Sequence, residues 1–298
     1  MGYRPWNLVA LTFALSLVAA TAHGQDRAAI IGPGDGEQSV SLSGTVLDVF
    51  TYRPVQCTPS LLLVVFHGIQ RDAGPYRDRA RPLADKLCAF VVAPKFDQQR
   101  FPRDRYQLGG VVEHGHLVPP GSRSIDLVAP LVAWARNAAG QPGMSYVLIG
   151  HSAGAQFVGR VAAFTPTQAA AIVLANPSTW VMPSTDTAAP FGFGGIEPPH
   201  DAEQALRAYL ALPIVVALGG ADTGTKSLDM SAEAMAQGPY RLARGQNAFK
   251  TAQAVAASRG WPLRWSLIEV PGVGHDAARM LAASQTDAAL QPLVRRGP

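Results

Sequence analysis

Six consecutive apolar residues, Leu61 to Phe66, constrain the fold of this chain more than any other feature of its sequence. A strand with one face in water alternates apolar and polar side chains, whereas a strand covered on both faces needs no polar positions. Continuous apolar strands of this kind are typical of parallel sheets that carry helices on both faces. The run therefore predicts a buried strand inside an α/β domain.

The rest of the chain alternates between strand and helix patterns. One or two opening strands are expected within 39–52, and later strands at 89–93, 146–149, 171–175, 214–218 and 263–270. Helices are expected at about 75–87, from 125 up to Gly140, and at 153–164, 201–210, 247–259 and from Asp276. Because parallel neighbours are joined by crossover connections, this alternation predicts a parallel sheet.

Local signals suggest where some of these helices begin and end. Ser124 is a candidate N-cap, and Asp201-x-x-Gln204 resembles a capping box. Gly140 is a stop signal, and Pro130, inside the helical pattern, predicts a kink.

Composition excludes several classes of protein. With 48% hydrophobic and 15% charged residues, the chain is not mainly disordered. The net charge of +4 is scattered and forms no Lys/Arg run, so nucleic acid is not an expected partner. The 29 glycines and 24 prolines follow no fixed period, which excludes collagen and solenoid folds.

The first residues, 1–22, resemble a secretory signal peptide. Arg4 supplies a positive start, 8–20 is apolar, and Ala20-Thr21-Ala22 fits a small-x-small cleavage site. The apolar run is shorter than the ~20 residues that a bilayer requires, so no stable membrane anchor is expected after processing. Cleavage is expected after Ala22, or else after Gly24, which leaves 23–298 as a single mature domain in the periplasm or outside the cell.

Export changes the interpretation of the two cysteines, because disulfides persist in oxidising compartments. Cys57 precedes one expected strand, and Cys88 ends a helix just before the next strand. Both should therefore lie at the same end of neighbouring parallel strands, where a Cys57–Cys88 disulfide can form. The alternative is a pair of buried free thiols.

Gly150-His151-Ser152-Ala153-Gly154 follows an expected strand and precedes an expected helix. This is the structural context of the G-x-S-x-G elbow, a turn that strains the serine backbone and exposes its hydroxyl. A chain with 29 glycines can match this pattern by chance. The flanking strand and helix are therefore stronger evidence for an elbow than the pattern itself. The alternative is a turn whose serine only caps the helix. As an elbow, it makes Ser152 the candidate nucleophile.

A serine nucleophile needs a base, and the base needs an acid that orients it. Among the seven histidines, only His275 is well placed, in a glycine-rich loop directly after the last expected strand. Asp222 lies just beyond the strand at 214–218 and is the favoured acid, with Asp186 and Asp229 in reserve. Parallel sheets of this type place their sites at these C-terminal strand ends.

An oxyanion hole requires two N–H donors aimed at the carbonyl oxygen. The first candidate is the N–H of Ala153, and the second is that of Ile69, in the turn after Phe66. Gln70 is the alternative donor and a candidate contact to the substrate. His67-Gly68 can also be interpreted as a tight turn with no role beyond its own backbone.

Two further segments bear on the site. The connection from Pro177 to His200 is long for a simple link and is a candidate lid or pocket wall. Within it, Trp180 is a candidate substrate-binding residue, and Phe191 and Phe193 could join it, although such aromatics can also just pack the connection. His114-Gly115-His116 follows Glu113, but no further ligand cluster supports a metal, and none is expected.

Taken in chain order, His67-Gly68-Ile69-Gln70, the elbow at 150–154, Asp222 and His275 resemble the α/β-hydrolase superfamily. The segment 67–97 is similar to the poly(3-hydroxybutyrate) depolymerase-like serine esterases. The resemblance implies a mostly parallel eight-stranded sheet with helices on both faces, a triad of Ser152, Asp222 and His275, and no cofactor. A single glycine before Ile69 resembles enzymes that act on medium or longer acyl chains.

The expected function is that of an exported serine carboxyl-ester hydrolase that forms an acyl-enzyme with a small or oligomeric ester. Two alternatives are a serine peptidase or amidase on the same fold, and a catalytically silent binding protein. The intact triad argues against the silent protein. No separate polymer-binding domain or linker is visible, so binding to a solid polymer is not expected.

Overall fold

The computed structural model describes residues 1–2 and 30–294. The expected signal peptide, 1–22, lies outside the described residues except for Met1 and Gly2. In the part that the structure describes, no helix is long and apolar enough to cross a bilayer.

Eight strands form one sheet in the order β1-β2-β4-β3-β7-β8-β9-β10, as expected for the fold class. They are β1 (Gly34–Leu42), β2 (Thr45–Arg53), β3 (Leu61–Phe66), β4 (Ala89–Pro94), β7 (Ser145–His151), β8 (Ala171–Ala175), β9 (Ile214–Gly219) and β10 (Ser266–Val270). A β1–β2 hairpin packs antiparallel against β4, and all later pairings are parallel. A separate short hairpin, β5 (Val112–Glu113) and β6 (His116–Leu117), holds His114 at its turn.

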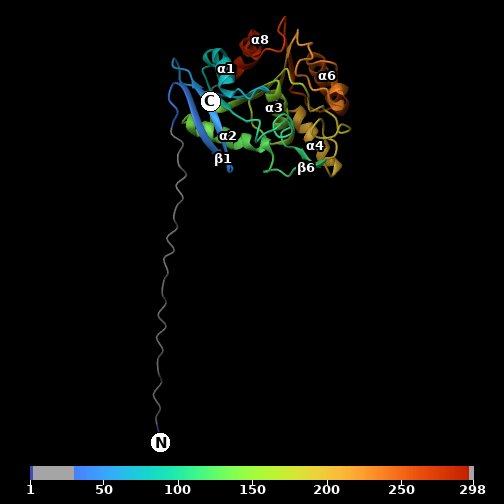
Figure 1. The fold of residues 1–298 in the computed structure, drawn as a ribbon. Helices are drawn as coiled ribbons and strands as arrows, with labels where there is room; N and C mark the ends of the chain where they lie inside the picture. Colours follow the sequence, from blue (N-terminus) through green and yellow to red (C-terminus); the bar gives the residue numbers. More distant parts are fainter. Residues whose placement is uncertain (3–29, 295–298) are drawn as a thin grey trace.

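Helices cover both faces of this sheet. One face carries α1 (Ala73–Leu87), α7 (Ala277–Ala282) and α8 (Ser284–Val294), and α1 and α8 lie together in Figure 1. The other carries the 3₁₀ helix η1 (Ser124–Leu127), α2 (Val128–Ala138), α3 (Ala153–Phe164), α4 (Pro199–Leu210) and α6 (Arg241–Arg259). The short helix α5 (Ala232–Gln237) precedes α6.

The two layers explain the apolar run at Leu61 to Phe66. Alternate residues of β3 join different cores, with Leu62 and Val64 on the α3 side and Leu63 and Val65 on the α1 side. All six residues are buried, because a strand side chain points to one face or the other and both faces are covered. The prediction of a doubly covered parallel strand is confirmed.

Several expected helix signals need correction, and α6 begins at Arg241, ahead of the start expected at 247. Ser124 is not an N-cap but the buried first residue of η1, whose first turn is closed by Asp126 accepting from the N–H of Arg123 at 2.9 Å. Pro130 falls in the first turn of α2, where no intrahelical N–H bond is lost, so it causes no interior kink. Similarly, α4 begins at Pro199, ahead of the capping box expected at Asp201.

The connection at 177–200 forms part of two cavity walls: Ser178 borders a cavity beside Ser152, and residues 193–197 border a separate cavity of about 450 Å³. It folds back on itself, with the N–H of Met182 bonded to the carbonyl of Phe191 at 2.7 Å. Phe193 is fully buried, and its ring lies 5.5 Å from that of Tyr209. Its aromatic residues anchor the segment to α3 and α4, as large apolar side chains do when a core lies beneath them.

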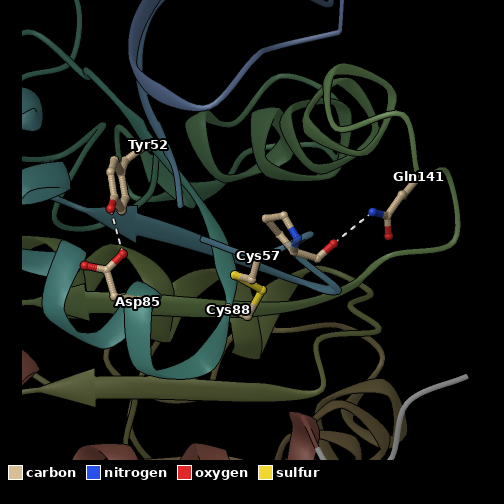
Figure 2. Close-up of a disulfide and its surroundings, with 6 residues drawn as sticks. Tyr52, Cys57, Asp85, Cys88 and Gln141 are labelled. Carbon is tan, nitrogen blue, oxygen red and sulfur yellow. Dashed lines mark hydrogen bonds between the residues drawn. A yellow bond between two sulfur atoms is a disulfide. The ribbon is translucent and has the colours of Figure 1, made fainter. Parts of the chain in front are cut away.

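The structure contains the predicted Cys57–Cys88 disulfide, with 6.1 Å between the two Cα atoms (Figure 2). β3 and β4 start side by side, since Leu61 pairs with Ala89, so the bridge links the chain just before each strand. Near it, the Gln141 side chain donates to the carbonyl of Pro59 at 2.8 Å. The bridge therefore lies at the end of the sheet where β3 and β4 begin, opposite the C-terminal strand ends.

Candidate active site

Ser152 lies between the last residue of β7 and the first residue of α3. Its backbone has φ 57° and ψ −118°, a conformation that L-residues rarely adopt. The turn is held because the Ser152 N–H donates to the carbonyl of Ala175 at 2.9 Å, while the Ser152 carbonyl accepts from the N–H of Gln156 at 3.1 Å. The strained serine is thus fixed by the neighbouring strand on one side and the helix on the other.

Both glycines of the elbow are required by close backbone approach. A Cβ at Gly150 would strike the carbonyl of Gly154, and one at Gly154 would lie 2.7 Å from the carbonyl oxygen of His67. Such distances are shorter than any real Cβ contact, so side chains are excluded at both positions. Gly154 therefore lets α3 pack directly against the turn that follows β3.

His275 and Asp222 complete a chain of hydrogen bonds that begins at Ser152. His275 Nε2 lies 2.8 Å from Ser152 Oγ, and His275 Nδ1 lies 2.7 Å from Asp222 Oδ2. Asp222 is 2% exposed, whereas the imidazole is partly open to solvent. With the carboxylate as acceptor, Nδ1 donates its proton to Asp222, which leaves Nε2 free to accept the proton of the serine hydroxyl.

A buried arginine holds the other oxygen of Asp222. Arg241 Nη1 lies 3.5 Å from Asp222 Oδ1, and both side chains are almost inaccessible. The same guanidinium donates to Ser178 Oγ at 3.1 Å and to the carbonyl of Ser227 at 2.7 Å. Burial lowers the pKa of Arg241, and the Asp222 carboxylate opposes that shift. Sequence reasoning missed Arg241, because nothing local marks a helix arginine as the partner of a distant acid.

Asn176 is a second residue that sequence reasoning missed. It follows β8 with φ 49°, and its amide Oδ1 accepts from the N–H of Gly219 at 2.8 Å. Its Nδ2 donates to the carbonyl of Gly274 at 3.3 Å. The side chain therefore ties together the loops that carry Asp222 and His275. Its position after a parallel strand was a usable signal, although it lacks the charge expected of a triad acid.

Two candidate oxyanion donors flank Ser152: Ile69 lies in the turn after β3, and Ala153 is the first residue of α3. Within the described residues, the N–H groups of Ile69 and Ala153 have no hydrogen-bond partner, and neither does that of Gln70, the alternative donor. His67 fixes this turn: its Nδ1 donates to the carbonyl of Gly68 at 2.9 Å, and its Nε2 accepts from the N–H of Phe96 at 3.0 Å. Burial lowers the pKa of His67 to about 4, so its imidazole is neutral at pH 7.

His151, inside the elbow, is buried between the site and α1. Its Nδ1 lies 3.0 Å from the hydroxyl of Tyr76, and its ring centroid lies 4.7 Å from that of His275. Burial, followed by repulsion from His275, lowers the pKa of His151 well below its usual value. A neutral His151 adds no competing charge next to the imidazole that faces Ser152.

Ser152 borders two cavities. The first, of about 410 Å³, is bordered by His275, Gln70 and Tyr76, and the second, of about 310 Å³, by Ala153 and Gln156. Ile69 and Ser152 border both cavities. The placement of Gln70 is thus compatible with substrate contact.

Trp180 does not border either cavity, contrary to the expectation for a substrate-binding residue. It is 1% exposed, and its backbone N–H and carbonyl both bond to the side chain of Gln237. An indole of this size is retained in the core by the apolar area that it buries.

Neither reserve acid contacts His275. Asp229 binds Arg103 at 2.6 Å, and Asp186 is exposed in the 177–200 connection. Within residues 1–2 and 30–294, no three His, Cys, Asp or Glu side chains gather in a way that could hold a metal ion.

Neither a scan against protein-family models nor a search of curated proteins found a match. Among solved structures, the poly(3-hydroxybutyrate) depolymerase LpqC of Bordetella parapertussis is 30% identical, with a TM-score of 0.80 over 90% of this chain and 92% of that one. Poly(aspartic acid) hydrolase-1 of Sphingomonas sp. KT-1 is also 30% identical, with a TM-score of 0.78 over 89% and 100%.

An esterase of Pyrobaculum calidifontis shares the fold at 15% identity and a TM-score of 0.50, over 88% of this chain and 84% of that one. The strand order, the strained serine between β7 and α3, and the similarity to two hydrolases over nearly their whole lengths lead to one conclusion: the chain belongs to the α/β-hydrolase superfamily.

Proposed function

We propose that the protein is an exported serine hydrolase of carboxylic esters. The observation that carries this proposal is the unbroken series from Ser152 Oγ to His275 to the buried Asp222, with distances of 2.8 and 2.7 Å, at the junction of two cavities. A positioned base and acid of this kind are what a serine needs to become a nucleophile at neutral pH.

In the proposed reaction, Ser152 Oγ attacks the ester carbonyl while His275 Nε2 takes its proton. Asp222 stabilises the imidazolium that forms, and Arg241 holds the carboxylate in place. The carbonyl oxygen, now negative, accepts hydrogen bonds from the N–H groups of Ile69 and Ala153. His275 returns the proton to the leaving alcohol, and water then resolves the acyl-enzyme by the same steps in reverse.

The similarity to a poly(3-hydroxybutyrate) depolymerase supports an ester as the substrate. The similarity to a poly(aspartic acid) hydrolase makes an amidase the second candidate, since the same residues can protonate a leaving amine. A direct comparison of p-nitrophenyl esters with the matching p-nitroanilides distinguishes the two.

Export is supported by the disulfide and by the signal-like sequence at 1–22. A Cys57–Cys88 bridge is stable in the periplasm or outside the cell, whereas a reducing cytosol opposes it. N-terminal sequencing of the secreted protein is expected to start at His23, directly after Ala22.

Replacing Ser152 tests the assignment directly. Ser152→Ala is expected to lower kcat for p-nitrophenyl esters by at least about 10³-fold while leaving the thermal unfolding midpoint near that of the wild type, because only the nucleophile is lost. A fluorophosphonate probe should label the wild type at Ser152 and fail to label the variant. Retention of more than a tenth of the activity, or no labelling of the wild type, would contradict the proposal.

A further inference from the structure

This inference rests on the proposed function, which gives the two cavities beside Ser152 different roles. His275 must hand a proton to the leaving alcohol, so the alcohol must lie on the side of Ser152 where the imidazole is. His275 borders the 410 Å³ cavity but not the 310 Å³ one. The acyl part of the substrate is therefore left to the 310 Å³ cavity, which we call the acyl cavity.

Two buried glutamines border the acyl cavity, where an esterase for alkyl chains would have apolar residues. Gln156 on α3 is 5% exposed, and Gln107 is 7% exposed. Each carries one amide oxygen and one NH₂ group, and a buried amide must find partners for both. Which end faces the cavity decides whether a substrate meets hydrogen-bond donors or acceptors there.

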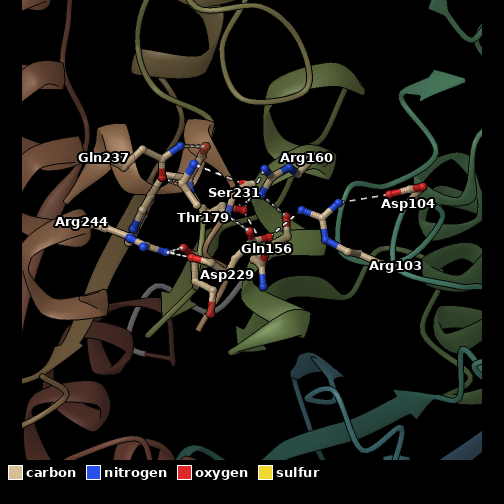
Figure 3. A network of polar contacts seen from close by, with 12 residues as sticks. Arg103, Asp104, Gln156, Arg160, Thr179, Asp229, Ser231, Gln237 and Arg244 are labelled. Atoms are coloured by element: carbon tan, nitrogen blue, oxygen red, sulfur yellow. Dashed lines mark hydrogen bonds and ion pairs between the residues drawn. The ribbon is translucent and has the colours of Figure 1, made fainter. Parts of the chain in front are cut away.

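The orientation of Gln156 is set by a buried arginine, as Figure 3 shows. Arg160 Nη2 donates to Thr179 Oγ1 at 3.1 Å, and Thr179 Oγ1 lies 2.8 Å from Gln156 Oε1. A guanidinium cannot accept a hydrogen bond, so the threonine hydroxyl accepts from Arg160 and donates its own proton to the Gln156 oxygen. The Gln156 NH₂ group is left without a protein acceptor among the described residues.

A second arginine orients Gln107 directly, without an intervening hydroxyl. Arg71 Nη2 donates to Gln107 Oε1 at 3.2 Å, and Arg71 itself is held by the carbonyl of Phe96 at 2.9 Å and by the ring of Tyr106. The Gln107 NH₂ group also lacks an acceptor within the described part of the chain. Gln156 and Gln107 lie far apart in the sequence and bind different donors. Even so, the amide oxygen of each is bound to a donor, and both side chains border the acyl cavity.

The charge around the acyl cavity favours an uncharged acceptor. Arg103 borders the cavity but is paired with Asp229 at 2.6 Å and with Asp104 at 3.2 Å. Asp229 borders the cavity as well, and a carboxylate in the substrate would meet its negative charge. A carbonyl oxygen can accept from an NH₂ group without that repulsion.

We infer that Gln156 and Gln107 are specificity-determining residues that select acyl groups carrying a second, uncharged oxygen acceptor, such as a further ester carbonyl, over plain alkyl chains. Their NH₂ groups donate to that oxygen in the acyl cavity while Ser152 attacks the scissile carbonyl. A plain alkyl chain leaves both NH₂ groups unpaired and is therefore hydrolysed less efficiently.

The test compares two esters of equal chain length. p-Nitrophenyl methyl succinate has a second carbonyl in its acyl chain, and p-nitrophenyl hexanoate does not. Each kcat/KM is divided by the rate constant for hydrolysis of that ester by hydroxide, which removes the difference in intrinsic reactivity. The wild type is expected to favour the succinate by about tenfold or more in this normalised ratio.

Gln156→Glu keeps the acceptor for Thr179 and removes the NH₂ donor, and it is expected to lower the normalised ratio about tenfold. Gln107→Glu keeps the acceptor for Arg71 and is also expected to lower the ratio. If one of the two variants fails to fold, the other still provides the test. Gln253→Glu, the same change on the exposed surface of α6, is the matched control and should leave the ratio unchanged.

The possible failures can be told apart. Hydrolysis of both esters with a wild-type ratio near one, or an unchanged ratio in both Gln→Glu variants, overturns the inference and leaves the proposed esterase intact. Hydrolysis of neither ester by the wild type overturns the proposed function, and this inference with it.

Discussion

The candidate triad depends on buried side chains that do not face the substrate. Asn176 and Arg241 bind the loops and the acid that place His275, and both are 1% exposed. Because the interior is densely packed, a shift of one such group is transmitted to the residues that it holds. Activity should therefore respond to residues that lie outside the two cavities.

Asn176→Gly tests this positioning role without backbone strain, since glycine also tolerates the observed φ of 49°. The variant loses both amide bonds, so the loops at Gly219 and Gly274 are no longer tied together. We expect kcat to fall about tenfold and KM to stay within about twofold, measured with p-nitrophenyl esters. A raised KM with an unchanged kcat would show that Asn176 acts on binding instead.

Stability should fall in mild acid because of His67 and His151. Burial lowers the pKa of both imidazoles, that of His67 from 6.5 to about 4, so the folded protein keeps them neutral. The unfolded chain protonates both near pH 6.5 and therefore binds more protons than the folded one below that pH. The stabilisation is complete above pH 6.5 and is lost as the pH falls toward 4.

The free energy of unfolding should accordingly drop on the order of 2 kcal/mol per pH unit near pH 5.5. Urea unfolding at pH 7 and pH 5 measures this slope. A slope about half as steep would show that one of the two histidines is already charged in the folded protein, and equal free energies would show that both are.

At the scale of elements, the packing of α3 against the turn after β3 is the critical contact. The Cβ of Gly154→Ala would lie 2.7 Å from the carbonyl oxygen of His67, so helix or turn must move. We expect a loss of about 1–3 kcal/mol in the free energy of unfolding, together with a fall in kcat, because Ile69 is carried by the same turn.

Gly159→Ala is the matched control in the same helix. Its Cβ would meet only Leu174 Cδ1, at an ordinary 3.8 Å. Alanine is the better helix former, so this variant should be unchanged or more stable by up to about 1 kcal/mol. Thermal unfolding of both variants provides the comparison, and equal effects at the two positions would refute the close approach at Gly154.

At the scale of the whole molecule, the disulfide and the candidate active site lie at opposite ends of the parallel strands. The disulfide lies before the first residues of β3 and β4, while Ser152, Asp222 and His275 follow the last residues of their strands. A strand of six residues spans about 20 Å, so the bridge is remote from the site.

Removing the bridge should lower stability and spare activity. The double variant Cys57→Ser/Cys88→Ser opens a loop with a sequence separation of 31 residues, which corresponds to roughly 3 to 4 kcal/mol in the loop-entropy model. We expect a lower thermal midpoint, with kcat/KM at 25 °C within about twofold of the wild type. An unchanged midpoint would mean that the bridge does not restrict the unfolded chain as the loop-entropy model requires.

Patterns that depend on burial alone could be predicted from the sequence, and their bounds agree with the structure. The run at β3, the strand β8 and the helix α3 fall where they were expected, because the period of apolar residues is set by which face is covered. The starts of η1 and α4 could not be predicted, because they depend on local bonds such as that between Arg123 and Asp126. Trp180 could not be assigned either, since an aromatic residue in a long connection fits a pocket or a core equally well.

The sequence by itself determined the fold class and the strand ends that carry Ser152, Asp222 and His275, since each follows from periodicity and chain order, whereas it left the Cys57–Cys88 bridge open against two free thiols. Only the tertiary structure decided that Arg241 and Asn176 support the candidate triad, and that Gln156 and Gln107, with their amide oxygens bound to donors, border one cavity. The physical reason is that these roles are hydrogen bonds between segments distant in sequence. Their partners are fixed only when the sheet has brought those segments together.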